Sequence, residues 1–135
     1  MDIRKKQRAV VNALEDVKGH DIVVFNVASL SPFFERVVIA SGDSSRQVKA
    51  LADSVQDKLR ALGARVHGVE GEQGGEWVLV DLGDVVVHIM HPAVREFYNL
   101  EEVWGGKTVR VNAAAGKKKP AAKKRAKAKR PRSKR

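Results

Sequence analysis

Acidic residues near one short turn are the first candidates for chemistry. The segment EWVLVDLGDVVVHIMHP, residues 76–92, holds two apolar runs with Asp81 and Asp84 on either side of a Leu-Gly pair. With Glu70 or Glu72 they would supply the carboxylates, within roughly 4 Å of shared ions, that a metal-dependent transfer enzyme needs. Asp and Gly are also ordinary turn formers, and a two-residue turn would place both aspartates at an exposed hairpin end. The composition therefore favours a turn over a metal site.

A second candidate is the segment SGDSSRQ, residues 41–47, which leads from an apolar run into a helical pattern. Free N–H groups at a helix start attract phosphate, but the segment lacks the lysine and glycines of a P-loop, and Asp43 would repel an anion. Ser44 and Gln47 instead have capping-box spacing, in which the serine oxygen accepts the third helical N–H and the glutamine reaches back to the cap. We expect a capped helix start, so Ser44 and Ser45 are not predicted to be nucleophiles.

The histidines of this region do not form a metal-binding pair. His88 and His91 are three residues apart, so on one strand they point to opposite faces. His88 shares a face with Asp84 and Val86, and a single strand histidine is typical of a hydrogen-bonded structural residue. Because the sequence holds no catalytic constellation, we expect a protein that is not an enzyme and needs no cofactor and no metal.

The remaining interpretation is that the hairpin is a binding surface. Trp77 alternates with Leu79 and Asp81 on one face of its strand, whereas Val78 and Val80 take the other face, the natural core side. A tryptophan on the less apolar face is typical of an interface anchor. If helices cover both faces of the sheet, Trp77 is a core residue instead. The alternation alone leaves both interpretations open.

Hydrophobic spacing predicts the elements that position these residues. One helix runs from Ile3 to about Val17 with Gly19 as its stop, and a second spans residues 48–62 with Gly63 in the left-handed cap position. Strands are predicted at residues 21–27, 36–41, about 65–69, and in both arms of the hairpin. The continuous branched residues of 36–41 indicate a strand that is covered on both faces.

The segment after the hairpin is predicted to be helical. Pro92 suits the first position of a helix, and Asn99 with Glu102 is expected to cap a final turn that ends near Trp104. The order α-β-β-α-β-β-β-α predicts an α/β or α+β domain with a mixed sheet flanked by helices. The last helix is expected to contain Val94, Phe97 and Tyr98.

The basic character of the chain belongs to its last residues. The net charge of the 135 residues is +10, yet residues 1–106 hold 12 Lys and Arg against 16 Asp and Glu, whereas residues 107–135 hold 14 Lys and Arg and no acid. Residues 117–135 have only Ala, Pro and Ser between their charges, so we expect them to be disordered. Such a run is typical of sequence-independent contact with RNA or DNA, and a solubilising terminus is the alternative. The residues expected to make the contact are Lys117, Lys118, Lys119, Lys123, Lys124, Arg125, Lys127, Lys129, Arg130, Arg132, Lys134 and Arg135.

Composition also sets the expected compartment. The chain has no cysteine, and none of its apolar runs approaches the roughly 20 residues that would span a bilayer. Its start carries no apolar signal-type core. We therefore expect a soluble cytoplasmic protein with one compact domain and an appendage.

Several blocks of the sequence, in this order, resemble one family. DIVVFNV, VVIASGDSSRQVKALAD, GVEGEQGGEWVLVDLGDVVVHIMHP and REFYNLEEVWG closely resemble the bacterial ribosomal silencing factor family, also called Iojap-related, from about Ile3 to Gly106. The resemblance implies a nucleotidyltransferase-like domain without the metal-binding acidic pair. It also implies binding to the large ribosomal subunit through its protein number fourteen, which sterically blocks joining of the small subunit and lowers translation when nutrients are short. Carried over by position, the contact surface would comprise Trp77, Asp81, Leu82, Asp84, His88 and Tyr98.

Two features depart from the family pattern. Arg36 and Val37 stand where many members have an aromatic pair, which leaves self-association of the free protein as a homodimer open. The family core usually ends near the EEVWG motif, so we predict a domain over residues 1–106 and a basic tail over residues 107–135. We predict that the tail adds affinity for ribosomal RNA.

Two rival functions come from other classes of protein. A divergent metal-dependent nucleotidyltransferase would use Asp81, Asp84 and Glu70. A histone-like nucleic-acid packager would bind through the tail alone, and Trp77 would then be irrelevant to binding.

Overall fold

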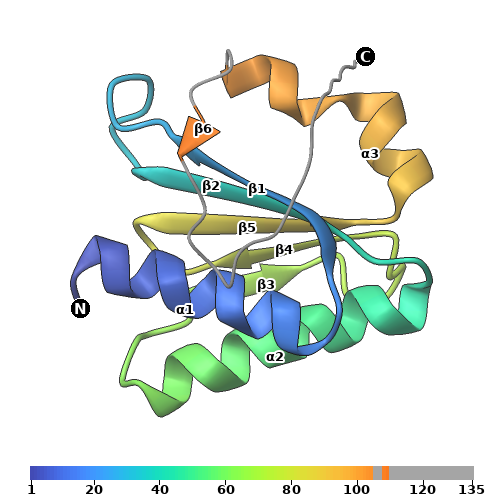
Figure 1. The fold of residues 1–135 in the computed structure, drawn as a ribbon, viewed down its shortest axis with the longest axis horizontal. Coiled ribbons are helices and arrows are strands. Elements are labelled where there is room, and N and C mark those ends of the chain that lie inside the picture. Colours follow the sequence, from blue (N-terminus) through green and yellow to red (C-terminus); the bar gives the residue numbers. More distant parts are fainter. Residues whose placement is uncertain (105–107, 110–135) are drawn as a thin grey trace.

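The computed structural model describes residues 1–104 and Thr108–Val109, and it forms one mixed β-sheet with helices on both faces (Figure 1). The strand order is β3-β4-β5-β2-β1-β6, in which β2 and β5 pair in parallel and every other neighbouring pair is antiparallel. This confirms the predicted fold class. The strands are β1 (His20–Asn26), β2 (Arg36–Ser41), β3 (Gly68–Glu70), β4 (Trp77–Asp81), β5 (Val85–Met90) and β6 (Thr108–Val109).

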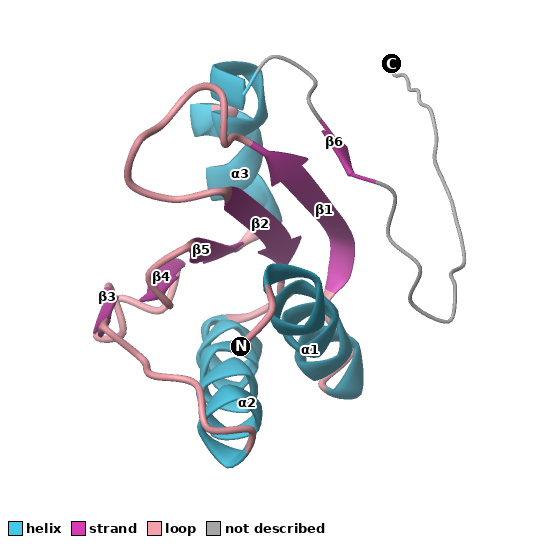
Figure 2. Ribbon diagram, turned by 90° about the vertical axis from the view of Figure 1, so that its left-hand side faces the viewer, coloured by secondary structure: helices cyan, strands magenta, loops and turns pink. Residues whose placement is uncertain are grey.

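The helices cover the two faces of the sheet unequally. Helices α1 (Ile3–Asp16) and α2 (Ser45–Ala61) lie together on one face and close the larger core (Figures 1 and 2). The short helix α3 (Pro92–Tyr98) and the 3₁₀ helix η1 (Leu100–Trp104) lie on the opposite face, above β2 in Figure 2. They close a smaller core around Phe25, Val27, Val37, Ile39 and Met90.

Strand β2 is buried on both faces, as its sequence predicted. Val38 and Ala40 belong to the larger core, whereas Val37 and Ile39 belong to the smaller one. The departure from the family pattern at the start of β2 is accommodated locally, because the Arg36 Nε donates to the Gln7 side chain on α1 at 2.9 Å.

Helix α2 begins with the predicted serine cap but not with the full capping box. The Ser44 Oγ accepts the Gln47 N–H at 3.1 Å. The Gln47 Oε1, however, accepts the N–H of Asp43 at 2.6 Å rather than that of Ser44, and its Nε2 donates to the carbonyls of Val17 and Lys18. The glutamine therefore ties the start of α2 to the end of α1, a contact between distant segments that no local pattern indicates.

The hairpin of β4 and β5 forms as predicted, but its turn lies one residue further along. Asp81 pairs with Val86, and the Leu82 N–H donates to the Val85 carbonyl at 2.9 Å, so Gly83 and Asp84 are the two central turn residues. The expectation that the two aspartates flank a Leu-Gly turn is wrong. Gly83 has φ +92°, and a positive φ at the first central position matches the right-handed twist of the strands.

The segment after the hairpin follows the prediction with one change. Pro92 starts α3, and the last turn ends at Trp104. Asn99 does not act as a side-chain cap for that turn. It ends α3 instead in the left-handed conformation, with φ +47°, and its carbonyl accepts the Glu102 N–H at 3.1 Å.

The sheet continues past the predicted domain boundary at residue 106. Thr108 and Val109 pair with Phe25 and Val24 and form β6, a strand that was not predicted. The basic residues expected to contact nucleic acid, 117–135, lie outside the described part of the chain. Among the described helices, none has the length and apolarity needed to cross a membrane.

Candidate functional site

The candidate site is the part of the sheet that α1 and α2 do not cover, which we call the open face. It is formed by alternate side chains of two strands: Trp77, Leu79 and Asp81 on β4, and Val86 and His88 on β5, all of them half-buried. The intervening valines of both strands are fully buried in the larger core. Figure 2 shows α3 above β2, whereas β3 and β4 lie to one side of the helix. The predicted alternation of Trp77 against the valines is confirmed.

Trp77 is the centre of an aromatic cluster on this face. Its indole Nε1 donates to the His88 Nδ1 at 3.0 Å, and its ring centroid lies 5.1 Å from that of Tyr98. Phe97 packs edge-on against Tyr98, with centroids 5.0 Å apart. The indole packs on the margin of the smaller core without being fully buried. Trp77 is therefore neither a fully buried core residue nor a fully exposed one, since one part of it packs on the core and another stays accessible.

His88 is held neutral by its surroundings. It pairs across the sheet with Leu79 on β4 and Ile39 on β2, both apolar, and the Trp77 indole covers one ring nitrogen. Burial lowers the pKa of His88 from 6.5 to about 4, because desolvation disfavours the charged imidazolium. At neutral pH this histidine is therefore an uncharged hydrogen-bonding group.

The two hairpin aspartates have structural partners that differ. The Asp81 Oδ1 accepts the Gly83 N–H at 2.8 Å, which is ordinary turn chemistry. The Asp84 Oδ1 pairs with the Lys6 Nζ on α1 at 2.6 Å, and the same ammonium donates to the Leu82 carbonyl. Both carboxylates keep part of their surface accessible, so they can still attract cationic groups. Lys6 was missed by the sequence reading because it lies more than 70 residues from the hairpin.

Leu82 does not belong to the accessible part of the site. Its side chain is 1% exposed and lies in the larger core. The carried-over expectation that Leu82 contacts a partner is therefore not supported by this conformation. Phe97 takes its place as an accessible apolar residue, with 80% exposure beside Tyr98 at 56%. The sequence predicted that Phe97 and Val94 both lie in the last helix, but it did not predict which of them is exposed. Val94 packs on the smaller core.

Helix α3, which carries Phe97 and Tyr98, is attached through one arginine in addition to the packing of Val94 on the smaller core. The helix has no fully buried residue of its own. The Arg95 guanidinium, 10% exposed, donates to the Ser41 Oγ at 2.9 Å and to the Asp21 carbonyl at 2.7 Å, and it forms a two-point pair with Glu101. A two-point arginine–carboxylate pair fixes orientation as well as distance. The aromatic cluster therefore depends on a polar attachment at its back.

The strands of the open face carry acidic residues but no lysine or arginine, although Asp84 is paired with Lys6 on α1. Residues 68–90, which include all of β3, β4 and β5, contain five acidic residues and no lysine or arginine. Clustered charge of one sign favours association with an oppositely charged surface. The acidic residues are Glu70, Glu72, Glu76, Asp81 and Asp84.

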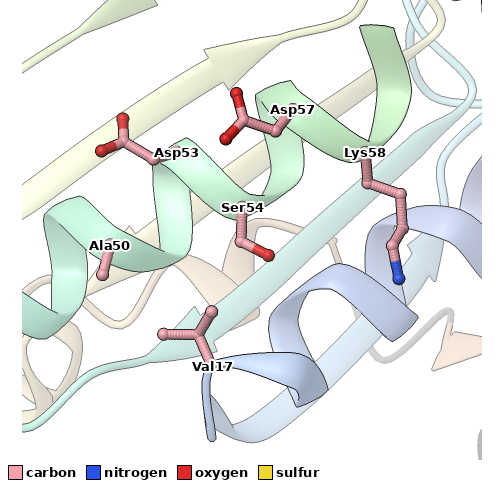
Figure 3. A pocket seen from close by; sticks show the side chains of 6 residues that line it. All are labelled: Val17, Ala50, Asp53, Ser54, Asp57 and Lys58. Carbon is pink, nitrogen blue, oxygen red and sulfur yellow. The ribbon is translucent and has the colours of Figure 1, made fainter. Parts of the chain in front are cut away.

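The described residues contain no cluster of three or more His, Cys, Asp or Glu side chains that could hold a metal ion. A separate hollow lies between the end of α1 and α2, lined by Val17, Ala50, Asp53, Ser54, Asp57 and Lys58 (Figure 3). Two of its polar groups already have partners, since the Ser54 Oγ donates to the Ala13 carbonyl at 2.8 Å and the Lys58 Nζ pairs with Asp16 at 2.6 Å. This hollow is better explained as helix packing than as a ligand site.

Comparison with known proteins gives consistent matches. The chain matches the family model described as "Ribosomal silencing factor during starvation" over residues 1–135. A protein named ribosomal silencing factor RsfS from Chromobacterium violaceum is 50% identical over 120 residues, which cover 89% of this chain and 97% of that protein. A crystal structure of a protein from the same species, 50% identical in sequence, has a TM-score of 0.78 and covers 83% of this chain and 93% of that one. A crystal structure of a Bacillus halodurans protein, 36% identical, has a TM-score of 0.72 over 79% of this chain and 98% of that one.

The matched sequence includes the hairpin, the aromatic cluster and the helix starts described above, and the solved structures reproduce the fold. On these grounds the chain belongs to the ribosomal silencing factor family.

Proposed function

We propose that this chain is a translational repressor that acts in the cytoplasm by binding the large ribosomal subunit. In this proposal the open face contacts protein number fourteen of that subunit and excludes the small subunit sterically, without a reaction or a cofactor. The observation that carries the proposal is the half-buried Trp77, held by His88 and Tyr98 on a sheet face that the two long helices leave uncovered. Tryptophan anchors of this kind dominate the energetics of protein interfaces.

The charge of the site supports a protein partner over direct contact with RNA. Five acidic residues and no basic ones occur between residues 68 and 90, so the strands of the open face would repel phosphate. A basic ribosomal protein surface is complementary to this distribution, and complementary charge speeds encounter and fixes orientation. The proposed contact residues are Trp77, Asp81, Asp84, His88, Tyr98 and, added from the structure, Phe97.

The basic tail has a separate place in the proposal. We propose that residues 117–135 add affinity for ribosomal RNA. Each neutralised phosphate releases condensed counterions, so this part of the affinity should fall steeply with added salt. In this proposal the open face determines which subunit is bound, and the tail adds affinity that does not depend on the RNA sequence.

Co-sedimentation with separated ribosomal subunits tests this division. The full chain and a chain ending at Gly116 are each mixed with large or small subunits at moderate and at high salt. We expect both chains to sediment with the large subunit only, with weaker and less salt-dependent binding by the shortened chain. If only the full chain sediments, with either subunit and only at low salt, the protein is a polycation that binds RNA unspecifically, and the proposal is wrong.

The tryptophan provides a sharper control in the same experiment. Trp77→Ala should weaken large-subunit binding by about 2 kcal/mol, roughly thirtyfold, because a central indole anchor is lost. Arg60→Ala, at an exposed position near the end of α2 on the other face of the sheet, is the matched surface control and should bind as the unmodified chain does. If Trp77→Ala binds the large subunit as tightly as the control does, the open face is not the binding surface and this part of the proposal is wrong.

A further inference from the structure

The hydrogen bond between Trp77 and His88 determines where the histidine carries its proton. An indole N–H can only donate, so the Nδ1 of His88, 3.0 Å from the Trp77 Nε1, must accept with an unprotonated lone pair. A neutral imidazole carries one proton, which then has to be on Nε2. Protonation of both nitrogens would place two donors against each other and break the contact.

The second nitrogen of this ring has no hydrogen-bond partner among the residues that the structure describes. Within the described part of the chain, the His88 Nε2 makes no hydrogen bond. Unlike the Trp104 Nε1, which is buried without a partner, the His88 Nε2 is not fully buried. The ring is on the outward side of β5 between apolar neighbours, Leu79 on one strand and Ile39 on the other. The Nε2–H is therefore a fixed donor in the middle of the open face.

We propose that Trp77 locks His88 as the Nε2–H tautomer, and that this single donor selects a partner surface with an acceptor oxygen at its centre. The inference rests on the proposed function, because it assumes that the open face is the surface bound. A backbone carbonyl or a side-chain oxygen of the partner would satisfy the donor, whereas a lysine or arginine there would leave two donors facing each other.

The surrounding charges define the rest of the partner. Asp81 on β4 and the exposed Glu70, which pairs with Leu79 from β3, lie on the open-face side of their strands and favour cationic groups around the rim. The complementary surface is therefore basic at its margin and offers an oxygen acceptor at its centre. A purely cationic surface matches the rim but not the donor, so the histidine adds a requirement that charge alone does not impose.

Two substitutions separate the outward donor from the inward acceptor. His88→Asn places its Oδ1 near the position of Nδ1 and can still accept from Trp77, but it cannot reach outward. His88→Gln extends to the position of Nε2 and retains an outward N–H donor. His20→Gln, at the start of β1 and outside the open face, is the matched control.

Binding of these variants to large subunits measures the contribution of the donor. We expect His88→Asn to bind roughly tenfold more weakly than the unmodified chain and His88→Gln to lose clearly less, the size expected for one hydrogen bond. If His88→Asn binds like the unmodified chain, or if both variants lose equally, His88 only supports Trp77 and the proposal is overturned.

Nitrogen NMR of the full chain, labelled at histidine, tests the tautomer without any partner. The expected spectrum has a protonated Nε2 and an unprotonated Nδ1 for His88, and Trp77→Phe should allow both tautomers. A protonated Nδ1 in the unmodified chain would refute the lock. If the unmodified chain does not bind large subunits, the proposed function is wrong, and so is the inference that the partner offers an acceptor oxygen to His88. The NMR spectrum would still determine which tautomer His88 adopts.

Discussion

The neutral, desolvated His88 should make the stability of the fold depend on pH in a defined direction. Its pKa is 6.5 in the unfolded chain and about 4 in the folded chain, because burial disfavours the charged form. Between these values the unfolded state binds a proton that the folded state does not. The free energy of unfolding therefore rises with pH, and the contribution present above pH 6.5 is lost as the pH falls toward 4.

The magnitude follows from the size of the shift. One unit corresponds to about 1.4 kcal/mol, so the difference between 6.5 and about 4 gives a total near 3 kcal/mol. At about pH 5 roughly 2 kcal/mol of this should already be lost. Such a loss is a large fraction of the stability of a small domain, which is typically about 5–15 kcal/mol.

Urea unfolding followed by far-ultraviolet circular dichroism, from neutral pH to about pH 5, measures this directly. His88→Asn does not titrate and keeps an acceptor for Trp77, so it is the reference. All other side chains are the same in both proteins, so their contributions cancel in the difference. We expect the stability advantage of the unmodified chain over His88→Asn to shrink by about 2 kcal/mol as the pH falls. A difference that stays constant, or grows toward low pH, would refute the assignment of a buried neutral histidine.

Three further substitutions test the packing that supports the open face. Leu51→Ala removes a fully buried side chain from the larger core and should cost about 2–5 kcal/mol in urea unfolding, whereas a cost below about 1 kcal/mol would contradict the core assignment. Ser44→Ala removes the α2 cap and should cost about 1 kcal/mol in thermal unfolding, and an unchanged midpoint would show that the cap is dispensable. Gly71→Ala introduces a Cβ against the Trp77 carbonyl at φ +87°, so it should lower stability by at least about 1 kcal/mol and shift the tryptophan fluorescence. An unchanged spectrum would mean that Gly71 does not position Trp77.

Most of the fold could be predicted because its elements have strong local signals. The apolar spacing of α2, its serine cap and Gly63 at φ +88° define that helix from end to end. Strand β2 occupies the predicted residues, because a continuous run of branched apolar side chains is typical of a strand that is buried on both faces. The turn was misplaced by one residue because Leu82–Gly83 and Gly83–Asp84 are both acceptable turn pairs, and only the pairing of the strands decides between them. Strand β6 has two residues and no pattern of its own.

The candidate site was predictable in position but not in detail. Alternation identified the strand face of Trp77, and the hairpin aspartates were correctly expected to belong to a turn, in which the Asp81 Oδ1 accepts the Gly83 N–H. The ion pair of Lys6 with Asp84 and the contacts of Arg95 join segments that are distant in sequence, so no local pattern contains them. Leu82 is buried because the turn begins one residue later than expected, and a position in the chain does not by itself determine whether a side chain is accessible.

The most direct test of the central claim is a subunit-joining assay. Large subunits are incubated with the full chain, with Trp77→Ala or with Arg60→Ala, small subunits are added, and joined ribosomes are measured by gradient sedimentation. The proposal predicts that the full chain and Arg60→Ala prevent joining in proportion to the large subunits occupied, while Trp77→Ala prevents it only at a roughly thirtyfold higher concentration. If large subunits saturated with the full chain still join small subunits normally, steric exclusion by the open face is contradicted.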